Sequence, residues 1–312
     1  MLNMLSPENI ITINRTGKLK LVNSALILDY IRVLPQYLIP QHLLSRLVYR
    51  ISRCEWPLFK NCLIRLFITW FRVDMSIAAE PAYRKYRHFN DFFTRSLRPD
   101  ARPVIKDNNI IVAPVDGSIS QAGRVVSGEI IQAKNRYFDL QSLLADENEM
   151  VDFFREGSFI TLYLSPRDYH RIHMPINGKL LKMIYVPGSL FAVNSHTTRT
   201  VNRLFARNER VISIFDTRAG FMSIIMVGAI NVSSMETVWA GEITPAANRS
   251  ITRTDYSGQP AITLAKGEEM GRFNMGSTVI VLFGRDAVNW NSDLQATGML
   301  NMGMELGRLL HP

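Results

Sequence analysis

The sequence predicts an α+β protein in which a β-rich body follows an N-terminal amphipathic helical segment, and three observations support this fold class. The chain has 312 residues, of which 47% are hydrophobic and 20% are charged, so it can bury a large core. Helical periodicity is concentrated before residue 103, and short apolar runs separated by turn residues fill the rest. The first 100 residues hold 15 Lys and Arg against 7 Asp and Glu, which leaves +1 of the net charge of +9 for the remaining residues.

The composition excludes several classes of protein. This balance of hydrophobic and charged residues is not that of a disordered chain. Cys54 and Cys62 are the only cysteines and lack Cys-x-x-Cys spacing, which indicates a reducing compartment rather than a disulfide framework. The N-terminus lacks the basic and apolar regions of a signal peptide, and no run of about 18 apolar residues predicts a membrane-spanning helix.

Residues 1–24 are polar and are expected to be irregular, whereas residues 25–103 are expected to form a basic helical arm. One predicted helix has an apolar face of Leu43, Leu44, Leu47, Val48 and Ile51 and a basic face of Arg46, Arg50 and Arg53. A second, after Pro57, has an apolar face of Leu63, Leu66, Phe67 and Trp70. Such helices suit an anionic membrane interface, with Trp70 and the three arginines as contacts, although a pair of ordinary core helices is the alternative. No exposed strand interleaves arginines with aromatic residues, so nucleic acid is not the expected partner.

The body is expected to span residues 104–290, after a short aromatic helix that Pro99 and Pro103 close. Its predicted strands lie at 110–112, 159–164, 180–186, 211–215, 223–230, 237–239, 261–264 and 278–283. Helices are expected at 140–144 and 146–154, and residues 291–312 are expected to form a C-terminal tail. The segments 114–119 and 175–180 resemble each other, and both have the character of strand, turn and strand.

A candidate nucleophile precedes the last predicted strand. Gly276 tolerates strained backbone angles and, without a Cβ, leaves its carbonyl open to attack, while Ser277 supplies a hydroxyl. A strand that begins with small residues explains the same pair, and there is no Gly-x-Ser-x-Gly elbow of a hydrolase here. The chemical interpretation therefore requires a base and an acid that orients it.

Two of the six histidines, His170 and His173, lie close together after the predicted strand at 159–164. Ser165 and Pro166 are expected to open a helical turn that places both on roughly one face. They are surface residues in one interpretation, metal ligands with Asp168 in a second, and a general base and a proton donor in a third. Three ligands so close together, without a distant fourth, are unusual, so no metal site is predicted.

Asp116, in the sequence Pro-Val-Asp-Gly, is the candidate acid. Asp-Gly pairs are common in hairpin turns, which explains this residue without any chemistry. Together with a histidine and Ser277, however, Asp116 completes the set that activates a hydroxyl. The acid fixes the imidazole tautomer, the imidazole accepts the serine proton, and the serine attacks.

Six motifs occur in order along the chain. They are FNDFFTRSLRP (89–99), PVDG (114–117), YLSPRDYHRIHMP (163–175), LFARNERV (204–211), ETVWAGEITP (236–245) and GRFNMGSTVI (271–280). By these motifs the chain resembles the phosphatidylserine decarboxylase family over about residues 30–290. Met275 stands where the bacterial membrane-bound members usually have leucine. Leucine to methionine conserves volume and apolar character, so cleavage is expected to survive.

The resemblance implies a proenzyme that cuts itself between Gly276 and Ser277. By this resemblance Asp116, His173 and Ser277 are the self-cleavage triad. Ser277 attacks the Gly276 carbonyl, the amide becomes an ester, and β-elimination releases the chain 1–276. The dehydroalanine left on the chain 277–312 is hydrolysed by water with loss of ammonia and becomes an N-terminal pyruvoyl group. His170 is implied to handle the proton in the later decarboxylation.

The implied reaction converts phosphatidylserine to phosphatidylethanolamine. The pyruvoyl carbonyl forms a Schiff base with the substrate amine and accepts the electrons left when CO2 departs. The resemblance also implies a homodimer, and the basic arm would hold the enzyme peripherally on the cytoplasmic face of the cell membrane. Two alternatives stay open: a serine hydrolase in which Ser277 remains a serine, and an inactive membrane-bound scaffold.

Overall fold

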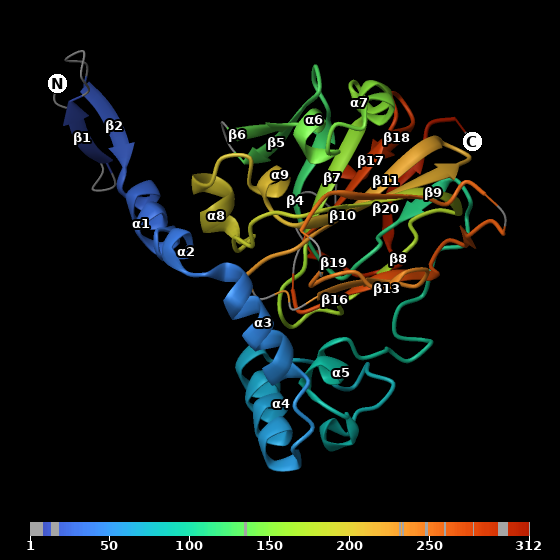
Figure 1. Cartoon of the computed structure of the whole chain (residues 1–312). Helices are drawn as coiled ribbons and strands as arrows, with labels where there is room; N and C mark the ends of the chain where they lie inside the picture. The colour runs from blue at the N-terminus through green and yellow to red at the C-terminus, as the bar shows by residue number, and fades with distance from the viewer. Residues whose placement is uncertain are drawn as a thin grey trace.

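An N-terminal arm of helices and a β-rich body make up the structure, which confirms the α+β prediction (Figure 1). The computed structural model describes residues 9–13, 19–133, 136–230, 232, 234–246, 249–258, 260–276, 278–292 and 299–311. Side chains are described from residue 26 onward. Ser277, the predicted nucleophile, lies outside the described residues, whereas Gly276 and Thr278 on either side lie within them.

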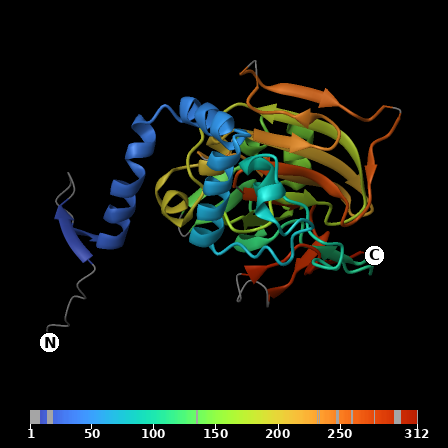
Figure 2. The same cartoon turned by 90° about the horizontal axis from the view of Figure 1, so that it is seen from below.

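The arm begins with a pair of strands. β1 (Asn9–Ile13) and β2 (Leu19–Asn23) are antiparallel, and Asn9 lies opposite Asn23. Both segments are rich in β-branched and aliphatic residues, which favour strands, but five residues are too few to show a clear periodicity. The pair stands away from the body in both views (Figure 1, Figure 2). Regular structure is therefore present where the sequence predicts an irregular segment.

The helices of the arm follow and confirm the helical prediction. They are α1 (Ser24–Val33), α2 (Pro35–Leu38), α3 (Gln41–Ser52) and α4 (Pro57–Phe71), followed by the short η1 (Tyr83–Lys85) and α5 (Phe89–Phe93). Pro35 and Pro57 open α2 and α4, where the missing N–H has no helical acceptor to lose. His88 caps α5, the predicted aromatic helix, because its side chain accepts a hydrogen bond from the backbone N–H of Asp91.

A cluster of aromatic side chains joins α4 to α5. The Phe67 ring meets the rings of Phe89, Phe92 and Phe93 edge to face, with centroid distances of 5.1, 6.0 and 5.9 Å. Ile64 is fully buried in the same cluster. Edge-to-face pairs add about 0.5–1.5 kcal/mol beyond the burial of apolar area. The cluster therefore fixes α4 against the segment that leads into the body.

An antiparallel sheet forms the centre of the body, in the order β14-β9-β10-β11-β17-β7-β4-β19, with β15 paired to β9. Its strands are β4 (Gly117–Arg124), β7 (Ser158–Tyr163), β9 (Gly178–Val186), β10 (Arg210–Thr217), β11 (Gly220–Val227), β14 (Thr252–Asp255), β15 (Thr263–Leu264), β17 (Thr278–Phe283) and β19 (Met299–Leu300). β17 lies between β11 and β7, and each of its residues is buried, as its uninterrupted apolar run predicts.

Smaller sheets and short helices surround this central sheet. One sheet contains β13 (Gly241–Glu242), β12 (Ser234–Thr237), β16 (Glu269–Asn274) and β8 (Arg171–His173), and another contains β18 (Val288–Trp290), β20 (Glu305–Leu309) and β3 (Ile110–Val112). The remaining elements are the pair β5 (Glu129–Ala133) and β6 (Arg136–Asp139) and the helices α6 (Leu140–Leu143), α7 (Asn148–Phe154), α8 (Ser195–Thr200) and α9 (Leu204–Arg207). Every strand and helix predicted for the body overlaps one of these elements.

The C-terminal segment belongs to the body. β19 pairs with β4, and β20 pairs with both β3 and β18. The described residues 299–309 therefore contribute strands to two sheets, where the sequence predicts a tail.

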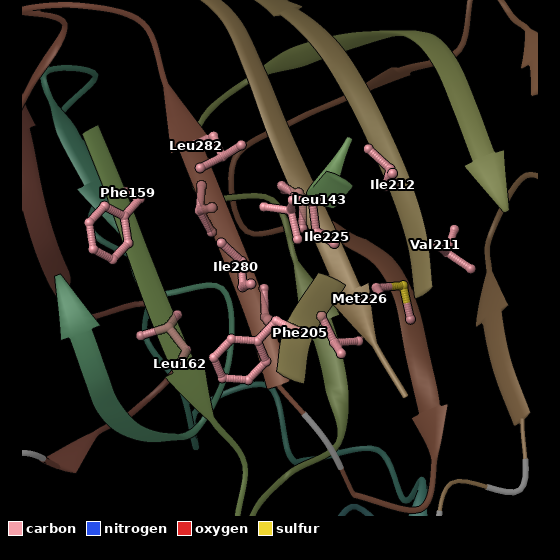
Figure 3. Packing of buried hydrophobic residues seen from close by; sticks show 14 of the residues in the cluster. Leu143, Phe159, Leu162, Phe205, Val211, Ile212, Ile225, Met226, Ile280 and Leu282 are labelled. Atoms are coloured by element: carbon pink, nitrogen blue, oxygen red, sulfur yellow. The ribbon is translucent and has the colours of Figure 1, made fainter. Parts of the chain in front are cut away.

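Apolar side chains from distant parts of the chain meet on the central sheet (Figure 3). Leu162 of β7, Ile225 of β11 and Ile280 of β17 are fully buried there, together with Leu143 of α6 and Phe205 of α9. Interiors packed in this way deform little, so the sheet gives a rigid support to the loops at its ends.

Candidate active site

The predicted cleavage junction lies where the chain passes from one sheet to another. β16 ends at Asn274 in a smaller sheet, and β17 begins at Thr278 in the central sheet. Between them Met275 has a φ of 92°, a value that residues other than glycine rarely adopt. Such a conformation costs about 1–3 kcal/mol. The backbone is therefore strained one residue before Gly276.

The imidazole of His170 lies against Gly276. A Cβ added to Gly276 would be 3.6 Å from Nε2 of His170. Nδ1 is 2.8 Å from the carbonyl oxygen of Asp168, which can only accept, so Nδ1 carries the proton and donates it. Nε2 is buried and has no hydrogen-bond partner within the described residues, from which Ser277 is missing. Burial lowers the pKa of His170 to about 3, so the ring is neutral and keeps a free lone pair beside the junction.

A tight turn and a strand carry the two histidines, so the predicted helical turn is wrong. The backbone N–H of Asp168 donates to the Ser165 carbonyl, and the Asp168 carboxylate accepts from the Ser165 N–H at 2.7 Å. This local side-chain bond offers the backbone an alternative to a helix. His173 then lies in β8, and residues three apart in an extended chain face opposite sides. His170 and His173 therefore do not share a face.

His173 has a different set of partners from His170. Its Nδ1 donates to the Gly267 carbonyl at 2.8 Å, which leaves Nε2 to accept from the Tyr169 hydroxyl at 2.9 Å. Burial lowers the pKa of His173 and raises the pKa of Tyr169, so both groups are neutral at pH 7. His173 therefore has a defined tautomer, but Tyr169 occupies the nitrogen that would act as a base.

Asp116 lies in the same region and is held by an arginine. Arg102 donates to its carboxylate through Nε at 2.8 Å and through Nη2 at 2.5 Å. The backbone N–H of Met302 donates to the same carboxylate at 2.8 Å. The negative charge of Asp116 raises the pKa of His173 slightly against the larger effect of burial. Within the described residues, no hydrogen bond joins Asp116 to His173.

Backbone pairing nevertheless keeps these two residues close. The His173 N–H donates to the Pro114 carbonyl at 2.8 Å, and the Val112 N–H donates to the Pro175 carbonyl at 3.1 Å. The two segments with similar sequences, 114–119 and 175–180, therefore meet at their first residues, and they then separate into β4 and β9, which are not neighbours in the central sheet. In each of them the chain leaves a smaller sheet and enters the central one. Gly117 is required at one of these crossings, since a Cβ there would lie 2.2 Å from the Tyr163 carbonyl oxygen.

Arg95 was not among the predicted site residues, yet its positive charge reaches His170. The guanidinium is buried, donates to the Arg167 carbonyl at 3.2 Å and lies over the Phe92 ring. Its charge lowers the pKa of His170 in addition to burial. Arg95 and Tyr169 lie inside the sequence motifs quoted above, whereas Arg102 lies between two prolines that indicated no more than a boundary.

A cavity of about 170 Å³ opens beside the junction. Met275 and Gly276 line it together with Phe67 and Phe71 of α4 and Phe93 of α5. Its walls are therefore mainly aromatic and apolar, and the arm supplies part of them. Exclusion of water strengthens electrostatic interactions and disfavours a free carboxylate, which suits the loss of CO2.

The predicted membrane contacts lie on the arm, but not all of them are exposed. Arg46, Arg50 and Trp70 are exposed, and Trp70 keeps 82% of its surface accessible. Arg53 instead binds Glu242 of the body at 2.8 Å and lies over the ring of Tyr49. Its charge is therefore used to attach α3 to the body.

Two properties of the described residues bear on the kind of site. No group of three or more His, Cys, Asp or Glu side chains among them is arranged to hold a metal ion. None of the helices in this part of the chain is both long and apolar enough to cross a membrane.

Comparison with known proteins defines the class. A family model described as phosphatidylserine decarboxylase matches residues 89–308, and a second, described as PSD, matches residues 31–72. The phosphatidylserine decarboxylase proenzyme of Methylococcus capsulatus is 50% identical over 272 residues, which cover 87% of this chain and 94% of that protein. The proenzyme of Shewanella putrefaciens is 46% identical over 288 residues, 91% of this chain and 100% of that protein. The one from Saccharophagus degradans is 48% identical over 276 residues, 88% and 96% of the two chains.

These matches place the chain among the pyruvoyl-dependent carboxy-lyases, which are made as proenzymes. The chain belongs to the phosphatidylserine decarboxylase family. Proenzymes of this family are cleaved into two chains, use a pyruvoyl group derived from a serine, and act on phosphatidylserine.

Proposed function

We propose that the chain cuts itself between Gly276 and Ser277 and decarboxylates phosphatidylserine at the new N-terminus of the chain 277–312. The observation that carries this proposal is the neutral Nε2 of His170, buried without a described partner beside Gly276. An unpartnered acceptor next to a residue without a Cβ leaves space for a small carbonyl group, so these residues fit a pyruvoyl group. That group supplies a carbonyl that binds the substrate amine and accepts electrons when CO2 leaves.

Ser277, His173 and Asp116 are the proposed cleavage residues. His173 would remove the hydroxyl proton of Ser277, and Asp116 would stabilise the imidazolium that results. Each of the two has another partner in the described chain, since Arg102 holds Asp116 and Tyr169 holds His173. Cleavage by this set therefore requires both residues to exchange partners.

His170 is proposed to act in decarboxylation. Its Nε2 lies beside Gly276, a residue that lines the apolar cavity, and bears no proton, because Nδ1 donates to the Asp168 carbonyl. The ring can therefore accept a proton at Nε2 and return it to the carbon that loses CO2. Phe93 limits the ring's movement, with a centroid distance of 4.1 Å between the two rings.

The fold explains how the two chains stay together after cleavage. β17 lies in the central sheet between β11 and β7, and β20 pairs with β3. The segment 277–312 therefore contributes a fully buried strand and a second paired strand to the body. Removing it would expose the core, so the cut chains are expected to copurify.

The arm is proposed to dock on the cytoplasmic face of the cell membrane. α3 buries Ser45, whose hydroxyl donates to the Val232 carbonyl of the body at 2.8 Å, while Leu43 and Leu47 remain 65% and 52% exposed. This is the reverse of an ordinary surface helix, which buries its apolar face. Trp70 on α4 is the most exposed residue of its aromatic face. An outward apolar face beside arginines is the pattern of a helix that lies in a membrane interface.

A pair of single variants tests the proposal. His173→Ala should accumulate the uncut chain, whereas His170→Ala should be cut and release little CO2 from phosphatidylserine. Loss of a general acid or base lowers a rate by a factor of about 100–10,000, which a gel and a CO2 assay resolve easily. His311→Ala is the matched control, because His311 is exposed near the C-terminus and should neither block cleavage nor lower the rate.

The same gel and CO2 assay also identify the results that would contradict the proposed roles. If His170→Ala stays uncut while His173→Ala matures, the histidine nearest Gly276 is the cleavage base and the two roles are reversed. If both variants mature and both release CO2 at the wild-type rate, this pair is not the active site.

A further inference from the structure

A second cavity lies where the arm meets the body. Its volume is about 540 Å³, and its polar lining includes Gln41, His42, Ser189, Arg207 and Arg249. A small cavity of about 20 Å³ adjoins it, because both are lined by His42 and Arg249, and it adds Arg46. Three arginines from separate parts of the chain therefore converge at this place.

Among the described residues, the acidic group that interacts electrostatically with an arginine of this cavity is Glu209, with Arg249. Within the described residues, no carboxylate forms an ion pair with Arg46, Arg207 or Arg249. The carboxyl group that lines the small cavity is Glu209, which is buried and accepts a hydrogen bond from the Tyr185 hydroxyl at 2.7 Å. Burial raises the pKa of Glu209, and in the described lining this one carboxyl group stands against three arginines. The cavity therefore has an excess of positive charge.

The guanidinium groups of Arg207 and Arg249 have N–H donors that none of their described contacts uses. The described contacts of the Arg249 side chain use Nη2 alone, which lies 2.6 Å from Nε2 of His42 and 3.5 Å from the Gly188 carbonyl oxygen. Arg207 lies over the face of the Phe191 ring at 5.0 Å, which leaves the edge of its guanidinium open. A guanidinium edge matches the oxygens of a phosphate, to which it can donate two parallel hydrogen bonds.

The rim of the cavity is apolar and exposed. Tyr37, Leu38 and Ile39 are 51%, 82% and 38% exposed, and Leu43, four residues further along the chain on α3, is 65% exposed. This rim joins the arm face that is proposed to enter the membrane interface. A phosphate reaching the cavity from a lipid would therefore carry its acyl chains toward an apolar surface.

One loop connects this cavity to the catalytic one. Gly188, Ser189 and Phe191 line the basic cavity, and the following residues, 192–194, line the catalytic cavity. The arm holds the loop in place, because Gln41 accepts from the Leu190 N–H at 2.6 Å and Gln36 accepts from the Ala192 N–H at 2.9 Å. A ligand in the basic cavity would thus contact the loop that forms one wall of the catalytic site.

We propose that this cavity binds the headgroup phosphate of an anionic phospholipid at a site separate from the catalytic cavity. Arg207 and Arg249 hold the phosphate between them, and Arg46 adds charge at the side. The lipid fixes the arm and the loop 188–194 in the positions that the active enzyme requires. The proposal rests on the membrane docking proposed above.

Vesicle binding by the full chain tests the site. The probes are phosphatidylcholine vesicles with and without phosphatidylglycerol, an anionic lipid that is not the substrate. Arg207→Gln and Arg249→Gln should each lower affinity for the anionic vesicles about tenfold, and the double variant should lose much less than the product, because both bind one phosphate. Arg50→Gln, an exposed charge on the same arm, should cost about fivefold, the usual effect of one basic residue near an anionic membrane. Affinity for pure phosphatidylcholine should be unchanged in all of them.

Two outcomes would overturn the proposal. Equal losses for Arg50→Gln, Arg207→Gln and Arg249→Gln that multiply in the double variant would show diffuse attraction without a site. Inorganic phosphate that raises the melting temperature of the wild type but not of the double variant, with no preference for anionic vesicles, would assign the site to a free anion. If the wild-type chain binds neither kind of vesicle, the membrane docking proposed above is itself wrong.

Discussion

The centre of the body and the outer face of the arm break the ordinary pattern of burial in opposite directions. Around the junction, His170, His173 and Asp116 are polar and at least nine-tenths buried. On the arm, Leu43 and Trp70 are apolar and mostly exposed. The first arrangement costs free energy unless each polar atom has a partner, and the second costs free energy unless something covers it.

Each exception points to a place where the protein is expected to meet another molecule. In the body, the described atom without a partner that lies against Gly276 is Nε2 of His170, beside the residue where the reaction is proposed to occur. On the arm, exposed apolar side chains lie on both helices, Leu43 and Leu47 on α3 and Leu66 and Trp70 on α4. We infer that Nε2 of His170 is positioned to contact the reacting group at the junction, and that the exposed apolar side chains of the arm are positioned to contact a membrane.

The largest expected effect comes from breaking the buried ion pair of the body. Arg102→Ala leaves the carboxylate of Asp116 buried with the Met302 N–H as its described donor. Loss of one partner of a buried pair typically costs about 3–5 kcal/mol, so the free energy of unfolding should fall by several kcal/mol. Urea unfolding measures it, with Arg98→Ala as the control, because Arg98 is half exposed and its pair with Asp100 is 3.5 Å long. An equal, small change in both variants would show that the Asp116 site is not tightly held.

Substitutions on the exposed face of the arm should change membrane affinity and leave the free energy of unfolding nearly unchanged, unlike Arg102→Ala. Leu66→Ser and Trp70→Ser should lower affinity for membranes, since burying one large apolar side chain contributes about 1.5–3 kcal/mol. The free energy of unfolding should change by less than about 0.5 kcal/mol, because these side chains are 61% and 82% exposed. Vesicle sedimentation and urea unfolding measure the two effects. Thr69→Ala on the same helix is the control, and a stability loss without a binding loss would show that this face packs against protein.

A smaller effect concerns the acid stability of the body. The pKa of His170 falls from 6.5 to about 3 on folding, so the unfolded chain binds a proton that the folded chain does not across that window. Stability should therefore decrease as the pH falls from about 6.5 toward 3, by at most about 1.4 kcal/mol for each pH unit from this group. His170→Gln should reduce that dependence when urea unfolding is compared at pH 7 and pH 5. An unchanged pH dependence would contradict a neutral, buried His170.

Much of the fold follows from the sequence, because its signals are local. The apolar run 278–283 predicts β17 to the residue, and the helices of the arm follow from their periodicity. Strand pairing cannot be predicted in this way. β20 pairs with β3, which is far away in the sequence, and no local pattern indicates that contact. The expectation of a C-terminal tail shows what is missed when long-range pairing is unknown.

In the candidate site, too, some residues could be predicted from the sequence and others could not. Sequence motifs indicated His170, His173 and Asp116, and the structure brings all three to the region of the junction. Their partners could not be predicted, because Arg102 comes from the linker that joins the arm to the body, and Met302 donates from beyond the junction. The helical turn predicted at Ser165 is wrong because the Asp168 carboxylate accepts the Ser165 N–H and closes a turn instead.

The most direct test of the central claim is the intact mass of the purified protein. We expect two chains, 1–276 and 277–312, with the smaller one lighter than an unmodified Ser277 chain by the mass of one ammonia molecule and blocked to N-terminal sequencing. Ser277→Ala should give one uncut chain of 312 residues. A wild-type preparation that releases CO2 from phosphatidylserine while its chain remains whole, or whose small chain begins with a free serine, would contradict the account.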